Sequence, residues 1–542
     1  MVKRLFALVL VLVLALSVSA CGGTKLASLE DDPDKKVELV WATTHLGHQD
    51  DEIVWKQFNK NLQKLLPNTT VDFIELNAEN WSNWMAAKKQ IDIAWTGYSF
   101  DMKSLITNRS YLGLNKLIDM YAPNIQAERE EWVDAYYSGT VDGELYAIPN
   151  QQPLLKQSVG LEIPYSCYDS FDVDAFLSEA HNNYHTTQKM IDLLDSYMAE
   201  LHAKKLVDTD TVGWNPETSV FYALVNRGYE SVSDLLSYDV WTDDVKVIAN
   251  YELPQEKMVQ KLLQSWYQKG WLKADYVTTG NNINGSRKAP INFTLTNNWI
   301  QADERGIKVN MDKYGEPESY TLYLDKIEQG YNGVSTIGSE ATYLAIPFTS
   351  HNPGRAIKLI DLLRSERGTE ANDLLNLLVY GFEKDSEYAA EYGTYHYTLG
   401  DGTEENADCA YGVDYTIQAD SNCIYGIPHW VVGNVYLTYR TPNIVSGQVE
   451  DALNYQLNVK PTLRKTPLYK FRPDTSKLGD LIANIENARS NAGKLTTKND
   501  AEFETTYEKM IKDCETAGMT EYKENIQKQV DEYIAANSDA AA

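Results

Sequence analysis

The sequence is poor in positive charge. Its 542 residues contain 49 Lys and Arg against 77 Asp and Glu, which gives a formal net charge of −28 at pH 7. A field of that sign repels phosphate backbones and anionic lipid head groups. Nucleic acid and anionic lipid are therefore not expected partners.

Sequence signatures of catalysis and metal binding are also missing. The chain has no His-Glu-x-x-His, Gly-x-Ser-x-Gly or Cys-x-x-Cys pattern, no phosphate loop and no dinucleotide fingerprint. Its eight His are scattered, and the pair His45 and His48 is weak evidence for a metal. No stretch has the spacing of a calcium loop. We expect no enzymatic activity, no cofactor and no metal.

Only one long apolar run is present, and it lies at the N-terminus. Lys3 and Arg4 precede an uninterrupted run from Leu5 to Leu16, and small residues then lead to Cys21. This order predicts a secretory signal whose apolar core is too short for an ordinary spanning helix. Because Val18 to Cys21 resembles the bacterial lipobox, residues 1–20 should be removed and Cys21 should carry a lipid. The alternative is an ordinary cleavable signal with an incidental Cys.

Cysteine is scarce, with five in the chain. Cys409 and Cys423 could form a disulfide around a short loop, worth ~3 kcal/mol if the geometry allows it, or could remain free. Cys514 falls on a helical apolar stripe, which predicts a buried free thiol. Cys167 has no obvious partner.

The first third of the folded part alternates strands and helices. Apolar patterning predicts strands at Val37–Thr43, Val71–Leu76 and Ile91–Trp95 and helices at Glu52–Leu66, Trp81–Lys89 and Ser99 to about Thr107. Such alternation builds a parallel sheet with helices on both faces. Ligands then bind beyond the carboxyl ends of the strands.

Polar and aromatic residues gather at those predicted carboxyl ends. Trp95, Thr96, Gly97 and Tyr98 follow the third strand, and Thr44 and His45 follow the first. Gly97 would let the backbone turn sharply or approach a ligand closely. We expect the ring of Trp95 to be exposed there; the alternative is a core residue that closes the sheet. Trp81 and Trp84 share a helix face and are better explained as core.

Several later segments resemble a known family. The stretch "LGLNKLIDMYAP", followed by "EEWVDAYYSGTVDGELYAIPNQQ", is similar to the extracellular solute-binding lipoproteins of ABC importers. The stretch "YLAIPFTSHNPGRAIKLIDLLRSERGTE" resembles the return crossing between the two lobes of that family, and "IPHWVVGNVYLTY" and the tail from "PLYKFRPDTSKLGDLIANIENA" resemble its large LplA-like branch. The resemblance implies an α/β, two-lobed periplasmic-binding-protein-like fold with a hinge and an inter-lobe cleft.

The resemblance also implies domain boundaries. Lobe 1 should hold residues 37–150 plus about 345–385, and lobe 2 should hold residues 151–344 plus about 386–470. A flexible linker at 21–36 should precede them, and a helical region at 471–537 and a disordered tail at 538–542 should follow. We expect the crossings near Asn150–Pro153 and Ala345–Thr349 to form the hinge. Residues 400–422 look longer than the family pattern, with no evident role.

The implied function is capture of a solute by a monomer that is lipid-anchored on the extracellular face of the membrane and delivers it to ABC permease subunits. The 36 Tyr and 12 Trp, against 12 Phe, favour an oligosaccharide, because such rings stack on sugar C–H faces and amides and hydroxyls bind sugar hydroxyls. Expected ligand contacts are Trp95, Thr96, Gly97, Tyr98, Thr44, His45, Asn150, Gln151, Asn298 and Trp299. A peptide or amino-acid-type solute, a surface glycoside hydrolase and a passive adhesin are the alternatives.

Overall fold

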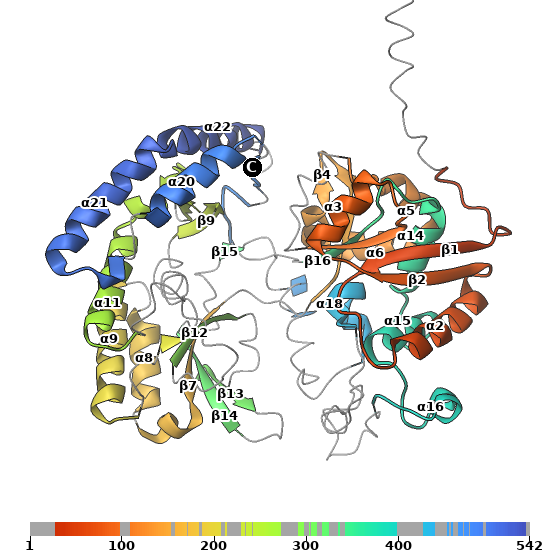
Figure 1. Cartoon of the computed structure of the whole chain (residues 1–542), viewed down its shortest axis with the longest axis horizontal. Helices are drawn as coiled ribbons and strands as arrows, with labels where there is room; N and C mark the ends of the chain where they lie inside the picture. The colour runs from red at the N-terminus through yellow and green to blue at the C-terminus, as the bar shows by residue number, and fades with distance from the viewer. Residues whose placement is uncertain are drawn as a thin grey trace, which may run out of the picture.

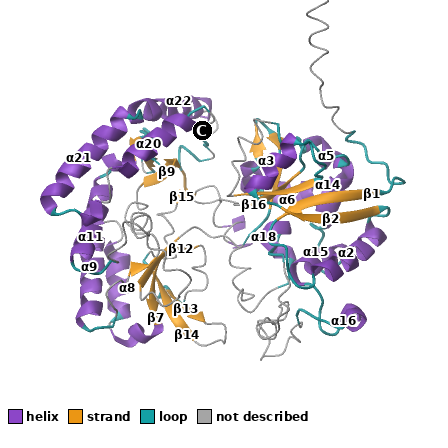
Figure 2. Cartoon of the chain, viewed as in Figure 1, coloured by secondary structure: helices purple, strands orange, loops and turns teal. Residues whose placement is uncertain are grey.

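The computed structural model describes two bodies that face each other, each built of helices packed on strands (Figures 1 and 2). The described residues are 28–97, 109–152, 158–170, 172–183, 187–206, 212–213, 229–233, 235–240, 242–272, 291–296, 303, 305–311, 317–324, 334–335, 342–397, 427–439, 453–454, 457–458, 464–469, 471–475, 477–491 and 495–537. Their buried apolar side chains form three cores: one in the first body and two in the second.

The first body is built on a five-stranded sheet in the order β2-β1-β3-β16-β6. The strands are β1 (Val37–Thr43), β2 (Thr69–Glu75), β3 (Ile93–Gly97), β6 (Ala147–Pro149) and β16 (Thr342–Ala345). β1, β2 and β3 are parallel, whereas β16 runs antiparallel to both of its neighbours. The predicted alternation of strand and helix is thus confirmed for the first three strands.

Helices of the first body pack against this sheet or against one another. They are α2 (Asp51–Leu65), α3 (Ala78–Ala86), α5 (Asn115–Tyr121), α6 (Pro123–Glu131), α7 (Val133–Ser138), α14 (Pro353–Leu362), α15 (Glu370–Tyr380), α16 (Glu387–Tyr392) and α18 (His429–Val432). Trp81 is 4% exposed and belongs to the first core, as its helical stripe predicts. Between β4 (Thr140–Val141) and β5 (Glu144–Leu145), Asp142 and Gly143 both have positive φ, which is the geometry of a type I′ hairpin turn.

The first body contains more of the chain than the sequence analysis expects. The described parts of 386–397 and 427–439, assigned there to lobe 2, pack on the first core through Tyr397, Val431 and Val435. They cover α15, whose apolar face is continuous with that core. The expected crossing at Ala345–Thr349 is also wrong. β16 already belongs to the first sheet, and the carbonyl of the buried Ile346 accepts a 2.9 Å hydrogen bond from Leu112 N, so the return crossing precedes Thr342.

The segment before β1 is docked on the first body, so the expected flexible linker at 21–36 is wrong for its last part. Asp31 Oδ1 accepts a 2.9 Å bond from Nε of Arg355, which is 1% exposed, and Lys358 Nζ lies 2.8 Å from Asp31 Oδ2. Burial alone would raise the pKa of Asp31, but the bonds from Arg355 and Lys358 hold it below its ordinary value. The segment is fixed because a buried guanidinium needs a charged partner.

The second body has its own mixed sheet, in the order β13-β14-β7-β12-β8. Its strands are β7 (Ser158–Pro164), β8 (Val212–Gly213), β12 (Ile291–Thr296), β13 (Ile307–Met311) and β14 (Pro317–Tyr323). The helices α8 (Val173–Asn183), α9 (Thr187–Ala203) and α11 (Pro254–Gln268) build the second core with it. Trp266 is fully buried in that core and donates from Nε1 to Asp195 Oδ1 at 3.0 Å.

The third core combines the C-terminal helices with a small sheet. It joins α20 (Gly479–Asn491), α21 (Asp500–Thr516) and α22 (Met519–Asn537) to β9 (Tyr229–Ser233), β10 (Leu236–Asp239) and β11 (Ile248–Ala249). Cys514 is fully buried and free in this core, as predicted, and Cys167 is buried and free in the second core. Cys21, Cys409 and Cys423 lie outside the described residues.

The second and third cores are joined by α11. Glu256, 3% exposed, lies 2.9 Å from Arg489 of α20, and Gln264 donates to the carbonyl of Lys498 at 2.7 Å. The C-terminal region is therefore part of the second body. The remaining short elements are β15 (Val334–Ser335), β17 (Arg464–Lys465), and the 3-10 turns at Tyr165–Ser170, Asn250–Glu252, Val435–Leu437 and Leu495–Thr497.

Candidate functional site

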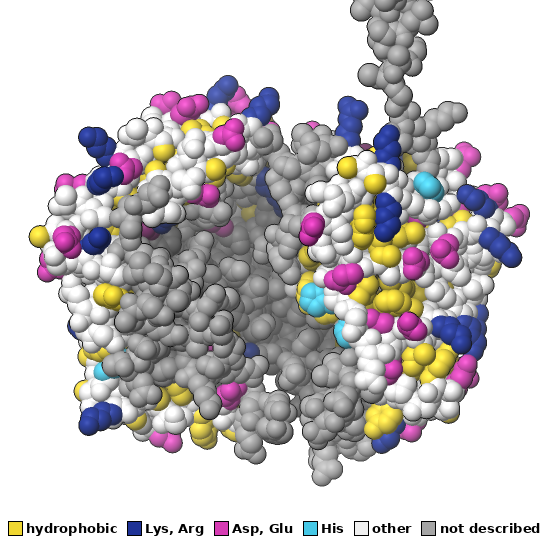
Figure 3. Space-filling view, viewed as in Figure 1, with side chains coloured by type: hydrophobic (Ala, Val, Ile, Leu, Met, Phe, Trp, Pro, Cys, Tyr) yellow, Lys and Arg dark blue, Asp and Glu magenta, His cyan; other side chains and the backbone are white. Residues whose placement is uncertain are grey.

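The candidate site lies on the edge of the first body that faces the second. β1 ends at this edge and α18 lies beside it (Figure 1). β3 runs parallel to β1 and ends at the same edge. In the space-filling view the surface is hollowed between the two bodies (Figure 3). Side chains that follow the ends of parallel strands are well placed to meet a ligand there.

The loop after β1 presents His45 at this edge. His45 is exposed and has φ of 62°, a left-handed conformation that is uncommon for a residue other than glycine. The loop is held in place by Asp51, whose Oδ2 accepts from the backbone N of Gly47 at 2.7 Å and of His48 at 2.9 Å. A strained backbone fixed by a buried carboxylate is typical of a functional position.

Trp430 of α18 meets His45 from the far end of the chain. The two ring centroids are 4.7 Å apart in an edge-to-face arrangement, and Trp430 is half-buried. Asn150 fixes α18 by donating from Nδ2 to the carbonyls of Trp430 at 3.1 Å and Val431 at 3.2 Å, and Thr342 donates to the same Trp430 carbonyl. Trp430 is absent from the expected ligand contacts, although it lies in the "IPHWVVGNVYLTY" stretch that carries the family resemblance.

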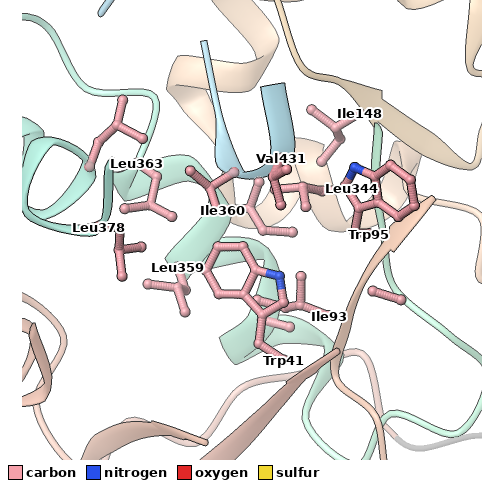
Figure 4. Close-up of a cluster of buried hydrophobic side chains, with 14 of the residues drawn as sticks. Trp41, Ile93, Trp95, Ile148, Leu344, Leu359, Ile360, Leu363, Leu378 and Val431 are labelled. Carbon is pink, nitrogen blue, oxygen red and sulfur yellow. The ribbon is translucent and has the colours of Figure 1, made fainter. Parts of the chain in front are cut away.

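Trp95 is not exposed as expected. It is 3% exposed and lies beside Ile148 and Leu344 in the first core (Figure 4), and its ring centroid is 6.3 Å from that of Trp430. β3 continues through Gly97, and β16 pairs with it along this length, so Thr96 is buried as well. The structure therefore fits the alternative in which Trp95 closes the sheet.

The other expected contacts divide into three groups. Thr44 is half-buried beside His45. Asn150 and Gln151 are 0% and 1% exposed, and the Gln151 carbonyl accepts a 3.0 Å bond from the backbone of Val435. Tyr98, Asn298 and Trp299 lie outside the described residues, as does the helix expected from Ser99 to about Thr107.

Two buried polar atoms at this edge have no hydrogen-bond partner within the described residues: Thr43 Oγ1 and Gln151 Nε2. They come from the end of β1 and from the residues after β6. An unpaired buried donor or acceptor costs free energy, on the order of 1–3 kcal/mol, which a bound polar molecule can recover. Their partner could be a hydroxyl group of a ligand or an ordered water molecule.

A buried ion pair supports Asn150 from behind. Arg364, whose side chain is 0% exposed, lies 2.8 Å from Glu128 Oε1. Its other terminal nitrogen donates to the carbonyl of Pro149 at 2.9 Å and to Asn150 Oδ1 at 3.3 Å. Burial works against the charge of Arg364, but Glu128 beside it keeps the pKa above the ordinary value. A chain of contacts thus runs from Glu128 through Arg364 and Asn150 to the backbone of Trp430.

A second polar contact fixes the start of α2. His396 is 0% exposed; its Nδ1 accepts from the backbone N of Phe382 at 2.8 Å, which leaves Nε2–H to donate to Asp50 Oδ2 at 3.1 Å. Burial lowers the pKa of His396, and the opposing effect of Asp50 does not offset it. The neutral imidazole is therefore the form that the fold requires.

The free energy of unfolding should fall as the pH drops below about 6.5, which is the pKa of His in an unfolded chain. Below that pH the unfolded chain binds a proton at His396, whereas the folded protein keeps this imidazole neutral. Chemical denaturation of wild type and His396→Gln between pH 5 and 8 tests this. The stability difference between the two proteins should shrink at acid pH; a constant difference would contradict the assignment. The comparison removes the opposite slope of Asp361, whose pKa burial raises to about 6.

The described residues contain no helix that is both long and apolar enough to cross a membrane. Among the same residues, no three His, Cys, Asp or Glu side chains come together as a set that could hold a metal ion.

Known proteins share this architecture. Residues 467–535 match a family model described as a domain of unknown function, DUF3502. No curated protein matches the sequence significantly. The structure is similar to that of the N-glycan transport solute binding protein NgtS from Streptococcus pneumoniae, with a TM-score of 0.65, 16% identity, and coverage of 92% of this chain and 99% of that chain.

Two further structures agree at lower similarity. One is an extracellular solute-binding protein from Bifidobacterium longum subsp. infantis, with a TM-score of 0.53, 13% identity, and coverage of 92% of this chain and 99% of that chain. The other is the S. pneumoniae ABC-transporter substrate binding protein FusA in complex with kestose, with a TM-score of 0.51, 13% identity, and coverage of 93% and 100%.

The chain has the two-lobed fold of ABC-transporter solute-binding proteins. The predicted fold class is thus confirmed, and the first body and the second body correspond to its two lobes. The matched family model covers most of the C-terminal helices that build the third core, α20, α21 and α22.

Proposed function

We propose that this protein is the extracellular solute-binding component of an ABC importer and that it captures an oligosaccharide between its two bodies. The observation that carries the proposal is the meeting of the rings of His45 and Trp430 on the inner edge of the first body, where Thr44 follows β1 and the amide of Asn150 holds α18. An aromatic face next to hydroxyl and amide groups is the combination that binds sugar rings. Catalysis forms no part of the proposal.

Proteins of the same fold indicate which sugars to test. NgtS has been crystallised in complex with Man1GlcNAc and Man5GlcNAc, and FusA with kestose. Their structures share 13–16% identity with this chain, so they support a carbohydrate ligand through the fold rather than a particular sugar. A mannose-rich N-glycan fragment and a fructan are therefore the first ligands to compare.

A thermal-shift screen of the purified soluble protein tests the proposal. A ligand that binds only the folded state raises the unfolding midpoint, by an amount that grows with its concentration relative to Kd. The panel should contain Man5GlcNAc, kestose, human milk oligosaccharides, and tri- and tetrapeptides as controls. Stabilisation by glycans alone is expected. Stabilisation by peptides would favour a peptide importer, turnover of a glycan would favour a hydrolase, and no stabilisation at all would favour an adhesin.

The lipid anchor gives a separate prediction. Replacing Cys21 by Ala should abolish incorporation of labelled palmitate and release the protein from the membrane fraction, because the proposed lipid is attached to that thiol. Ligand affinity should not change, since Cys21 is not among the residues proposed to contact the ligand. Wild type and Cys167→Ser should both keep the label. A labelled Cys21→Ala variant would contradict the anchor.

A further inference from the structure

The C-terminal region, residues 464–537, makes hydrogen bonds to the first body as well as to the second. Tyr469 OH donates to Asp134 Oδ2, and Arg472 Nη1 donates to the carbonyl of Ser138 at 2.7 Å. Asp134 and Ser138 lie near the two ends of the short helix α7, which belongs to the first body. The C-terminal region therefore bridges the two bodies directly, in addition to the chain crossings.

On the side of the second body, the bridging segment is firmly attached. Tyr533 of α22 donates from its hydroxyl to the carbonyl of Tyr469. Asp474 exchanges two bonds with Gln529, at 2.6 Å and 3.1 Å, and Leu468 is buried in the third core. Burial raises the pKa of Tyr533 to about 12, with a further contribution from the neighbouring Tyr137 of α7. The segment is therefore fixed relative to α22.

On the side of the first body, α7 supports the candidate site. Ser138 Oγ accepts a 3.0 Å bond from Tyr343 of β16, the strand that covers β3. Trp132, the residue before α7, packs its ring 5.0 Å from that of Tyr436. Tyr436 in turn donates to the carbonyl of Gln152. The side-chain amide of Gln152 donates to the hydroxyl of Thr342, which itself donates to the carbonyl of Trp430. Packed groups thus connect α7 to the wall of the site.

α7 needs external support. It spans six residues, and no side chain caps its N-terminus. A helix this short is unstable in isolation, so its position depends on its neighbours. The side-chain bonds from Tyr469 and Arg472 hold it near both ends.

We propose that the C-terminal region is a positioning element of the binding site: Tyr469 and Arg472 clamp α7, which fixes the site wall and limits the separation of the two bodies. The expected effect on ligand affinity rests on the proposed function, whereas the expected effect on the separation of the two bodies does not. Moving the bodies apart must break both bonds, so their loss lets the ligand-free protein sample wider separations. Binding then starts from fewer competent molecules, which lowers the apparent affinity.

The test is a double variant, Tyr469→Phe with Arg472→Met, which removes both donors and keeps a ring at residue 469 and a long unbranched side chain at residue 472. The matched control is Tyr507→Phe with Arg489→Met, because these side chains donate to partners in the second body, Tyr251 and Glu256. Small-angle scattering of the ligand-free proteins should show a larger radius of gyration for the double variant alone. Titration of the glycan found by thermal shift should show about five- to tenfold weaker binding, the scale of one or two hydrogen bonds.

A second pair of variants separates positioning from general loss of structure. Asp134→Asn keeps an oxygen acceptor for Tyr469 and should bind like wild type. Asp134→Leu removes that acceptor and should show part of the double variant's effect, because the bond from Arg472 to the Ser138 carbonyl remains. If the double variant matches its control in both scattering and affinity, the proposal is wrong; a change in scattering alone refutes the link to the site. If no glycan binds even the wild type, the proposed function fails, and the scattering comparison still decides whether the clamp exists.

Discussion

Replacing Trp430 by Ala should remove most of the ligand binding and little of the stability. Its ring is half-buried at the edge facing the second body and touches the exposed His45, so it offers a face on which a sugar can stack. Loss of a central aromatic contact costs roughly 2 kcal/mol or more, by analogy with protein interfaces, and thus about 30-fold in Kd. The bonds from Asn150 and Thr342 reach the backbone carbonyl and should survive the substitution.

Trp95→Ala is the matched control, because the two rings are neighbours and Trp95 is buried whereas Trp430 is half-buried. Trp95 is 3% exposed, so its removal should leave a cavity and cost about 3–5 kcal/mol of unfolding free energy. Calorimetric titration with the best glycan and chemical denaturation should be run on both variants. Normal affinity in Trp430→Ala combined with weak affinity in Trp95→Ala would reverse the assignment and place the sugar on β3.

Local sequence patterns account for most of the first sheet. β1 begins and ends where its apolar run predicts, at Val37 and Thr43. The run is recognisable because this strand lies between β2 and β3 and is largely buried. The type I′ turn at Asp142 and Gly143 follows equally from the pair itself, since both residues tolerate positive φ. Such features depend on neighbours within a few residues.

The errors concern contacts between distant parts of the chain. Trp95 is buried because β3 pairs with β16, which lies some 250 residues later in the sequence. The residues around Trp95 contain no pattern that predicts this pairing. Asp31 is fixed by Arg355, 324 residues away. Trp430 lies on a four-residue helix that is held at the site by bonds from Asn150, 280 residues earlier, and from Thr342. In each case the composition of the segment is compatible with several positions, and tertiary packing selects one.

Arg364→Met should be the most destabilising of the proposed substitutions. It leaves the carboxylate of Glu128, 9% exposed, without its buried partner, and it leaves the Pro149 carbonyl without its donor. Removing one partner of a buried ion pair costs about 3–5 kcal/mol of unfolding free energy, whereas removing one partner of an exposed pair costs about 0–1 kcal/mol. Lys60→Met is the matched control, because the side chains of Lys60 and of its carboxylate partner are 57% and 51% exposed.

A double variant distinguishes the effect of an unpaired charge from the effect of lost packing at residue 364. Adding Glu128→Leu to Arg364→Met removes the stranded carboxylate, so denaturant titration should show that the pair of changes costs less than Arg364→Met alone. Ligand affinity should be reduced in Arg364→Met and in the double variant alike, because in both Asn150 Oδ1 lacks the guanidinium that helps to orient its amide toward α18. Additive losses of stability would mean that Arg364 acts through packing rather than through its charge, while recovered affinity would mean that Asn150 orients α18 unaided.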